Sequence, residues 1–269
     1  MGKIGIEKLH LEVTRDCTLE CMHCFRGNRE HNYMDVSIIQ KLLKNVNHIN
    51  FLLLTGGEPL LAINQLEKVI EMIKTNGIKV DSISIITNGT VLSPRVIRTL
   101  KFFDSNSRLY LTVSKDKFHT MELENKGLSD VRDENVSFLK SLFGIYEYLP
   151  NRLPNLIQKV GRAVNLTDEE LREINYSGDV QTKYVLGDEK DIEKSRSKYE
   201  KPIFDGRCIR GCLSIAVDGS IVPAYCSFNE EDEMCYVRYN RFKSYPEMVS
   251  SIGQSEDGKV KVKSDNKSL

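Results

Sequence analysis

The sequence predicts an α/β fold in which parallel strands alternate with helices. Over the first 165 residues, short apolar segments with strand periodicity alternate with longer segments whose apolar residues recur at helical spacing. In addition, polar and glycine-containing motifs directly follow the strand segments, as they do in parallel sheets of the open or barrel kind. A chain of 269 residues is long for one domain, so we expect one large domain with an appendage.

The first predicted strand covers residues 8–14, where apolar and polar side chains alternate. Asp35 is the predicted N-cap of the helix that follows. Residues 50–55 form the second predicted strand and are almost continuously apolar, as expected for a parallel strand covered on both sides. The apolar face of the intervening helix consists of Ile38, Ile39, Leu42, Leu43 and Val46.

The next predicted helix ends at Asn76-Gly77, because glycine readily adopts the left-handed conformation that closes a helix. Residues 82–87 are the third predicted strand. A further helix begins at Ser93-Pro94, since proline is tolerated in the first helical turn, and residues 108–114 are the fourth strand. The apolar residues of these two helices are Leu66, Val69, Ile70 and Ile73, and Val96, Ile97 and Leu100.

Residues 136–149 predict another apolar helix, and residues 155–160 predict a fifth strand that leads into Gly161-Arg162. The segment after it is charged and sparsely apolar. It contains only two short expected elements, at 171–174 and 180–185, of which the second could supply a sixth strand. We therefore expect a core domain over residues 1–165, a connecting segment over 166–205, a cysteine-rich extension over 206–253 and a polar tail over 254–269.

Charge and hydropathy narrow the possible partners. Lys+Arg and Asp+Glu both number 38, so no long-range field attracts a polyanion, and we do not expect a nucleic-acid partner. No segment has the apolar core of a secretory signal or the length needed to cross a bilayer. We therefore expect a cytoplasmic protein with no membrane partner. In a reducing compartment, seven cysteines grouped as three and four favour metal ligation over disulfides.

The first cysteine group, Cys17, Cys21 and Cys24, lies within eight residues, directly after the first predicted strand. Such a triplet can form disulfides, a zinc site or an iron–sulfur cluster. Zinc is disfavoured because no fourth ligand follows nearby at matching spacing. Four further polar motifs follow the other predicted strands, and these loops should converge on one mouth: Thr55-Gly-Gly-Glu-Pro59, Thr87-Asn-Gly-Thr90, Ser114-Lys-Asp116 and Gly161-Arg162.

The pattern C-x3-C-x2-C after the first strand, together with Gly-Gly-Glu-Pro after the second, resembles the radical S-adenosylmethionine (SAM) superfamily. The matching residues are spread over roughly 8–163. His23 stands where the family usually has an aromatic residue. The resemblance implies a partial (β/α)6 TIM barrel, possibly contracted here, because about five strong strand patterns are visible where the family barrel has six.

The resemblance also implies the chemistry. Cys17, Cys21 and Cys24 would hold a 4Fe-4S cluster and leave one iron without a protein ligand. In the family, SAM chelates this iron and is reductively cleaved to a 5'-deoxyadenosyl radical, which removes a hydrogen atom from the substrate. A flavodoxin or ferredoxin is the implied reductant. The implied SAM-binding residues are His23, Gly56, Gly57, Glu58, Pro59, Asn88, Ser114 and Arg162.

Several of these positions have a structural alternative. Asp116 and His119 resemble a Ser-x-Asp-x-x-His motif of some peptide-modifying members, which would make them catalytic, but His119 could equally be a surface residue. Arg162 could sit in a salt bridge, and Asn88-Gly89 could be an ordinary turn. The paired glycines at 56 and 57 would let the backbone approach a ligand closely.

The second cysteine group brackets a predicted hairpin whose turn is Asp218-Gly219. It resembles the SPASM and twitch extensions of the superfamily, which hold an auxiliary iron–sulfur cluster. All four thiols could bind an auxiliary 4Fe-4S cluster, or three could bind it and leave one, such as Cys226, as a catalytic hydrogen-atom donor. Zinc on four cysteines is the structural alternative. The group consists of Cys208, Cys212, Cys226 and Cys235.

The Ser-x-Asp-x-x-His stretch and the hairpin favour a ribosomally synthesised precursor peptide as the substrate, with epimerisation or crosslinking as the outcome. The short chain favours the alternative, a small-molecule dehydrogenase of the 2-deoxy-scyllo-inosamine type. A nonenzymatic scaffold is disfavoured because Cys17, Cys21, Cys24 and Glu58 are all present.

Overall fold

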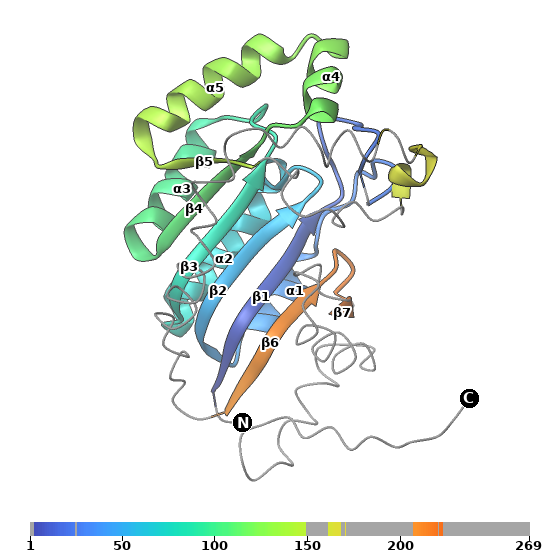
Figure 1. Cartoon of the computed structure of the whole chain (residues 1–269). Coiled ribbons are helices and arrows are strands. Elements are labelled where there is room, and N and C mark those ends of the chain that lie inside the picture. Colours follow the sequence, from blue (N-terminus) through green and yellow to red (C-terminus); the bar gives the residue numbers. More distant parts are fainter. Residues whose placement is uncertain are drawn as a thin grey trace, which may run out of the picture.

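The computed structural model describes residues 3–148 apart from residue 25, residues 161–167 and 170, and residues 207–222 apart from residue 220. One sheet organises these residues (Figure 1). Its strands are β1 (Ile4–Thr14), β2 (Val46–Gly56), β3 (Lys79–Thr87), β4 (Arg108–Ser114), β5 (Ile145–Tyr148), β6 (Arg207–Ile215) and β7 (Ile221–Val222). The helices are α1 (Val36–Leu43), α2 (Ile63–Asn76), α3 (Pro94–Asn106), α4 (Lys117–Asn125) and α5 (Ser129–Leu142), with short 3-10 turns η1 (Pro59–Leu61) and η3 (Gly161–Asn165).

The strands follow the order β5-β4-β3-β2-β1-β6-β7. All pairs from β5 to β6 are parallel, and β6 and β7 form an antiparallel hairpin. Because the strands are parallel, their carboxyl ends share one edge of the sheet, where the first four strands end at Thr14, Gly56, Thr87 and Ser114. The predicted α/β class with a parallel sheet is confirmed, and the architecture is compatible with a partial barrel.

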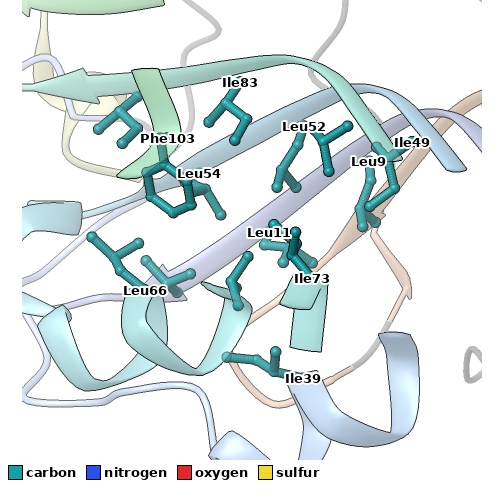
Figure 2. Packing of buried hydrophobic residues seen from close by; sticks show 14 of the residues in the cluster. Leu9, Leu11, Ile39, Ile49, Leu52, Leu54, Leu66, Ile73, Ile83 and Phe103 are labelled. Carbon is teal, nitrogen blue, oxygen red and sulfur yellow. The ribbon is translucent and has the colours of Figure 1, made fainter. Parts of the chain in front are cut away.

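The main core lies between the sheet and helices α1, α2 and α3 (Figure 2). The strands contribute leucine and isoleucine side chains that are removed from solvent, and Phe103 of α3 is the largest fully buried side chain. Each such side chain contributes about 1.5–3 kcal/mol by burial. The fold therefore holds the carboxyl ends of the strands on a rigid support. The labelled residues of Figure 2 are Leu9, Leu11, Ile39, Ile49, Leu52, Leu54, Leu66, Ile73, Ile83 and Phe103.

Local signals set the helix ends as predicted. The Asp35 carboxylate accepts from the Ser37 amide at the start of α1, and the Ser93 hydroxyl accepts from the Val96 amide at the start of α3. Gly77 closes α2 in the left-handed conformation, with φ 61°. These caps satisfy backbone groups that the helices themselves leave unpaired.

Two predicted elements differ from the structure, and one helix was not predicted. Val46 begins β2 instead of ending the first helix. The helix predicted at 136–149 ends at Leu142, and residues 145–148 form strand β5 beside β4. An additional helix, α4, precedes α5, so two helices separate β4 from β5. The strand predicted at 155–160 lies outside the described residues.

The sixth parallel strand comes from an unexpected part of the chain. It is β6, which pairs with β1, whereas the segment proposed for it, 180–185, lies outside the described residues. The hairpin around Asp218-Gly219 is present, with Ser214 opposite Val222. The start of the predicted cysteine-rich extension thus continues the sheet; the domain boundaries at 165, 205 and 253 stay a prediction. Among the described residues, no helix is both long and apolar enough to cross a membrane.

Candidate functional site

The three-cysteine group lies on a loop, residues 15–33, that follows the carboxyl end of β1; we call it the cysteine loop. Figure 1 shows it near α4 and η3 at the carboxyl end of the sheet. Asp16 ties its two ends together. The Asp16 carboxylate accepts from the Cys17 amide at 2.9 Å, from Arg29 Nε at 2.8 Å, and from the Tyr33 hydroxyl at 2.6 Å, and it contacts His31 Nδ1 at 3.1 Å.

These contacts determine the charge of Asp16. Burial alone would raise its pKa, but the hydrogen bonds from Tyr33, His31 and Arg29 lower the pKa of Asp16 to about 2. Burial and the same bond raise the pKa of Tyr33 to about 12. Asp16 is therefore a fixed carboxylate at neutral pH, and it holds the cysteine loop in a closed shape.

The three cysteines are buried to different degrees: Cys21 is buried, and Cys17 and Cys24 are half-buried. Cys21 is 5% exposed and packs in a small apolar cluster separate from the main core, formed with Leu19, Phe118, Leu123, Ala163 and Leu166. Burial, followed by the charge of Glu58, raises the pKa of Cys17 to about 11. Burial also raises the pKa of Cys21, and the neighbouring thiols Cys17 and Cys24 add to the effect. Thiols that are largely removed from water and lie on one loop suit ligation to a positively charged centre better than reaction with solutes.

The glycine loop after β2 packs directly on the start of the cysteine loop. The Gly57 amide donates to Thr14 O at 2.8 Å, and the Glu58 amide donates to Asp16 O at 2.7 Å. A Cβ on Gly56 would lie 2.2 Å from Thr14 O, and one on Gly57 would lie 2.2 Å from Asp16 O. We expected these glycines to admit a ligand; in the described chain, the close approach they permit is to the backbone of residues 14–16.

Glu58 connects the glycine loop to the loop after β3. Its side chain is fully buried, and its carboxylate accepts from Leu60 N at 3.0 Å, Thr87 Oγ1 at 2.8 Å and Asn88 N at 2.7 Å. Burial raises the pKa of Glu58 to about 6, although the three hydrogen bonds favour its ionised form. Pro59 is buried in the first position of η1, directly after this residue.

Asn88 reaches from β3 to the first cysteine. Its Nδ2 donates to Thr18 Oγ1 at 2.9 Å and lies 3.6 Å from Cys17 Sγ, while its Oδ1 accepts from Thr90 N at 3.0 Å. The Leu19 amide also donates to Cys17 Sγ, at 3.4 Å. Asn88 thus does more than form a turn, since it orients the loop that carries the thiols.

Asp116, His119 and His23 form a compact group beside Cys21. The Asp116 carboxylate caps α4 by accepting from the Phe118 and His119 amides at 3.0 Å each, and it is hydrogen-bonded to His119 Nδ1. His23 Nε2 lies 3.7 Å from the same carboxylate. The His23 ring stacks on Phe118, with centroids 4.8 Å apart, and meets His119 edge-on at 5.0 Å.

The electrostatics of this group follow from its burial. Burial lowers the pKa of His23 to about 4, although Asp116 opposes the effect, so His23 is neutral at physiological pH. Burial would raise the pKa of Asp116, but the hydrogen bond from His119 lowers it below its ordinary value. His119 is therefore at the site, beside a cysteine, and not a solvated surface residue; its side chain is 19% exposed.

Arg162 binds the cysteine loop. Its Nε donates to Cys21 O at 2.9 Å, its Nη1 donates to Gly27 O at 2.6 Å, and its backbone amide donates to Cys24 O at 2.9 Å. These acceptors are carbonyls, so the salt bridge considered as an alternative is not what holds this side chain. Ser114, the last residue of β4, is 8% exposed and lies two residues before Asp116.

A family comparison shows what this site is similar to. Residues 11–117 match the model of the radical SAM superfamily, and this segment contains the cysteine loop, the glycine loop and Asn88. The segment 11–117 is thus similar to a radical SAM domain. The donor set fits the cluster that such a domain binds: three thiols on one loop, of which that of Cys21 is buried and those of Cys17 and Cys24 are half-buried, with two N–H groups directed at the sulfur of Cys17.

Curated relatives match part of the chain. An uncharacterised protein of Methanocaldococcus jannaschii is 32% identical over 105 residues, which cover 37% of this chain and 36% of that protein. The radical SAM cyclopropyl synthase TigE of Paramaledivibacter caminithermalis is 27% identical over 122 residues, which cover 37% of this chain and 25% of TigE. The chain thus spans about a third or less of the length of these relatives.

Solved structures also align with the chain. The structure of anSMEcpe with bound AdoMet and Cp18Cys peptide aligns with a TM-score of 0.44 and 16% identity, covering 84% of this chain and 75% of that chain. Streptococcus suis SuiB aligns with a TM-score of 0.38 and 14% identity, covering 92% of this chain and 64% of that chain.

The second cysteine group lies away from the radical SAM site, as far as it is described. In the backbone register, Cys208 pairs with Gly5 and Cys212 with Lys8, in the first half of β1. At about 3.3 Å per residue, Lys8 and Gly5 lie roughly 20–30 Å along the strand from Thr14. The same spacing separates the backbones of Cys208 and Cys212, four residues apart in β6, by about 10–13 Å, which is too far for a disulfide between them. Cys226 and Cys235 lie outside the described residues.

Two acidic residues of the radical SAM domain were missed. Asp16 directly precedes Cys17, and this position was the signal, since an acid at the end of a strand that enters a buried loop needs partners. Glu12 is 6% exposed within β1. It is hydrogen-bonded to Arg26 of the cysteine loop and accepts from Val217 N at 3.2 Å, so it links that loop to the β6–β7 hairpin. A charged residue inside a strand whose neighbours are buried was its signal.

Proposed function

We propose that the chain is an enzyme that holds a 4Fe-4S cluster on Cys17, Cys21 and Cys24 and uses it to cleave SAM reductively. One observation carries the proposal: within a radical SAM domain, the glycine loop and Asn88 both bind the start of the cysteine loop. When bound, the cluster would pass one electron to SAM, which breaks a carbon–sulfur bond and yields methionine and a 5'-deoxyadenosyl radical that takes a hydrogen atom from the substrate.

The chain's own residues would prepare the three ligands. Asp16 and Arg162 fix the backbone of the cysteine loop on both sides of the thiols. The apolar cluster of Leu19, Phe118 and Ala163 excludes water around Cys21. The N–H groups of Leu19 and Asn88 that face Cys17 Sγ would stabilise its thiolate.

Residues at the same edge of the sheet would bind SAM. Glu58 is held rigidly by three donors, and a carboxylate oxygen can accept a further hydrogen bond, so it can receive the ammonium group of SAM. His23 would face the nucleoside as a neutral ring. Asp116 would act as a positioning residue for His119, which would contact the substrate. The remaining members of the proposed SAM site are Gly56, Gly57, Pro59, Asn88, Ser114 and Arg162.

We propose a peptide as the substrate, modified at a carbon atom by epimerisation or crosslinking. The Ser114–His119 stretch supports this, because His119 and Asp116 of that motif lie beside Cys21. The relative TigE is named as a cyclopropyl synthase, and we extend to this chain only the expectation of radical chemistry on a carbon framework. We also propose a flavodoxin or ferredoxin as the electron donor, and a cytoplasmic location.

For the second cysteine group we propose an auxiliary 4Fe-4S cluster of the SPASM or twitch kind. The hairpin that separates Cys212 from Cys226 supports it. Because Cys208 and Cys212 lie beside the first half of β1, such a cluster would sit away from the cysteine loop. Cys226 is the proposed hydrogen-atom donor if only three of the four thiols bind.

The test uses full-length protein reconstituted with iron and sulfide under anaerobic conditions. SAM and dithionite are added, and 5'-deoxyadenosine and methionine are quantified. We expect both products from the wild type and from Cys226→Ala, and neither from Cys17→Ala, Cys21→Ala or Cys24→Ala. Equal product from the wild type and the three loop variants would refute the proposed cluster site.

The substrate is tested in the same assay with synthetic peptides encoded by short reading frames beside the gene. The proposal predicts that a peptide substrate increases 5'-deoxyadenosine formation. The peptide product should either be lighter by the mass of two hydrogen atoms, as crosslinking requires, or incorporate deuterium from heavy water, as epimerisation requires. Stimulation by an aminocyclitol, with no response to peptides, would instead establish the small-molecule dehydrogenase.

A further inference from the structure

One group of side chains at the site has the composition of a single-metal site. Cys21, His23 and His119 present one sulfur and two nitrogen atoms that all lie within 4.8 Å of one another. Among the described residues this is the group of cysteine, histidine and acidic side chains that meets this separation. Cys17 and Cys24 are not part of it, so it differs from the three-cysteine set of the cysteine loop.

His119 is already oriented as a metal ligand. Its Nδ1 is hydrogen-bonded to the carboxylate of Asp116, which is itself fixed by the Phe118 and His119 amides. A carboxylate on one ring nitrogen sets the tautomer that leaves a lone pair on the other, and metal-bound histidines commonly have such a partner. Nε2 of His119 is thereby available to a metal ion.

His23 contributes the second nitrogen. Its Nδ1 is buried and has no hydrogen-bond partner, whereas its Nε2 lies 3.7 Å from Asp116. Stacking on Phe118 at 4.8 Å and edge contact with His119 at 5.0 Å fix the plane of the ring. An unpaired buried nitrogen costs stability, and a metal ion would satisfy it.

We propose that Cys21, His23 and His119 bind one divalent transition-metal ion, zinc or ferrous iron, when the cysteine loop carries no cluster. Thiolate and imidazole ligands suit both ions. With Zn–S and Zn–N bonds of about 2.3 and 2.0–2.1 Å, a tetrahedral site separates its ligand atoms by about 3.3–3.6 Å, so the three side chains, whose ligand atoms lie within 4.8 Å of one another, would close by about 1.5 Å at most on binding. On binding, the thiol proton of Cys21 passes to solvent and the sulfur bonds to the metal.

Cys21 cannot serve this ion and the proposed cluster at the same time, so the two states exclude each other. A ferrous ion held here would be the first iron delivered to the loop, whereas zinc held here would block cluster assembly. The inference shares Cys21 with the proposed function but does not require SAM cleavage, because it concerns the protein before a cluster is present.

The test is a titration of metal-free, full-length protein with Co²⁺ under anaerobic conditions, followed by visible absorption. Equivalents are counted relative to the wild type, because the C-terminal cysteines can bind metal as well. We expect His23→Ala, His119→Ala and Cys21→Ser each to bind one equivalent of Co²⁺ fewer than the wild type. Cys17→Ser and Cys24→Ser, together with His48→Ala at the start of β2, should retain it.

Asp116→Asn provides a variant that keeps the helix cap, because asparagine is also a good N-cap. We expect it to retain the equivalent but to bind Co²⁺ about 10–100-fold more weakly. Circular dichroism verifies that each variant is folded. Unchanged binding in folded His23→Ala and His119→Ala, or loss in Cys17→Ser and Cys24→Ser as in Cys21→Ser, would overturn the inference.

Iron and sulfide counts after reconstitution are measured separately. All three cysteine variants should lose the loop cluster, while only Cys21→Ser loses the Co²⁺ equivalent. A wild type that binds Co²⁺ as expected but assembles no loop cluster would contradict the proposed function alone. A wild type that assembles the cluster without this Co²⁺ equivalent would contradict the inference alone.

Discussion

Replacing Asp16 by asparagine should destabilise the protein before any cluster is bound. The Asp16 side chain is 8% exposed, and folding lowers the pKa of Asp16 from its ordinary value of 3.8 to about 2. Since a pKa difference of one corresponds to about 1.4 kcal/mol, the ionised carboxylate contributes about 2 kcal/mol to the free energy of unfolding at neutral pH. Asparagine keeps the size of the side chain but not its charge.

The pH dependence follows from the direction of this pKa change. Because the folded-state pKa of Asp16 is depressed, its contribution is fully present well above pH 3.8 and is lost as the pH falls through about 2. We expect Asp16→Asn to lower the free energy of unfolding by about 2 kcal/mol at pH 7 and by about 1 kcal/mol at pH 3. The wild type should approach the variant as the solution becomes acidic.

The assay is urea unfolding of the metal-free protein, followed by circular dichroism at both pH values. Asp104→Asn, at an exposed position of α3, is the matched control and should change stability by less than about 0.5 kcal/mol. If Asp16→Asn matches the control at pH 7, or if its effect is the same at pH 7 and pH 3, then the hydrogen bonds of Asp16 do not hold the cysteine loop as described.

Three further predictions concern the contacts of the cysteine loop. Gly57→Ala would place a Cβ 2.2 Å from Asp16 O. It should lower the free energy of unfolding by about 1–3 kcal/mol and reduce 5'-deoxyadenosine formation at least about tenfold. The control Gly144→Ala has nothing within 4 Å of its Cβ and should be neutral in urea unfolding and in product assays. A lysine at position 162 cannot reproduce both bonds of Arg162, to Cys21 O and Gly27 O, so Arg162→Lys should lower the free energy of unfolding by about 1.5–3 kcal/mol and lower the melting temperature. The control Arg95→Lys, in an exposed pair with Glu67, should change the melting temperature little. Burial raises the pKa of Glu58 from 4.5 to about 6. Its contribution to the free energy of unfolding is therefore present below pH 4.5 and falls by about 2 kcal/mol as the pH rises through 6. A wild type and a Glu58→Gln variant with parallel curves of stability against pH would contradict this.

The first four strands were predictable because each leaves a short strand pattern in the sequence, an almost continuous apolar run in β2 and an alternation of apolar and polar side chains in β1. Helix α4 was not, because Phe118 and Leu123 are its only buried side chains and give too little periodicity. Strand β5 has four residues and follows the apolar helix α5 closely, so its residues were assigned to that helix. The pairing of β6 with β1 joins residues about 200 apart, and a sequence pattern does not specify such a partner.

The site, like the fold, was predictable in part. The rule that parallel strands end at one edge predicted that the cysteines, Glu58, Asn88 and Asp116 would converge, since that rule depends only on strand order along the chain. The partners of each side chain were not predictable. The contact of Arg162 with SAM stays a prediction, whereas its bond to Cys21 O, across 141 residues of sequence, was not expected. Asp116 was expected to be catalytic, and its position also makes it the N-cap of a helix that the sequence did not reveal.

The most direct test of the account is electron paramagnetic resonance of the reduced, reconstituted protein with and without SAM. If Cys17, Cys21 and Cys24 leave one iron open to SAM, the wild-type signal changes when SAM is added. The Cys17/Cys21/Cys24→Ala variant should then show no SAM-responsive signal, whatever signal its C-terminal cysteines retain. A wild-type spectrum that SAM leaves unchanged, or a triple variant that responds to SAM in the same way, would contradict the claim.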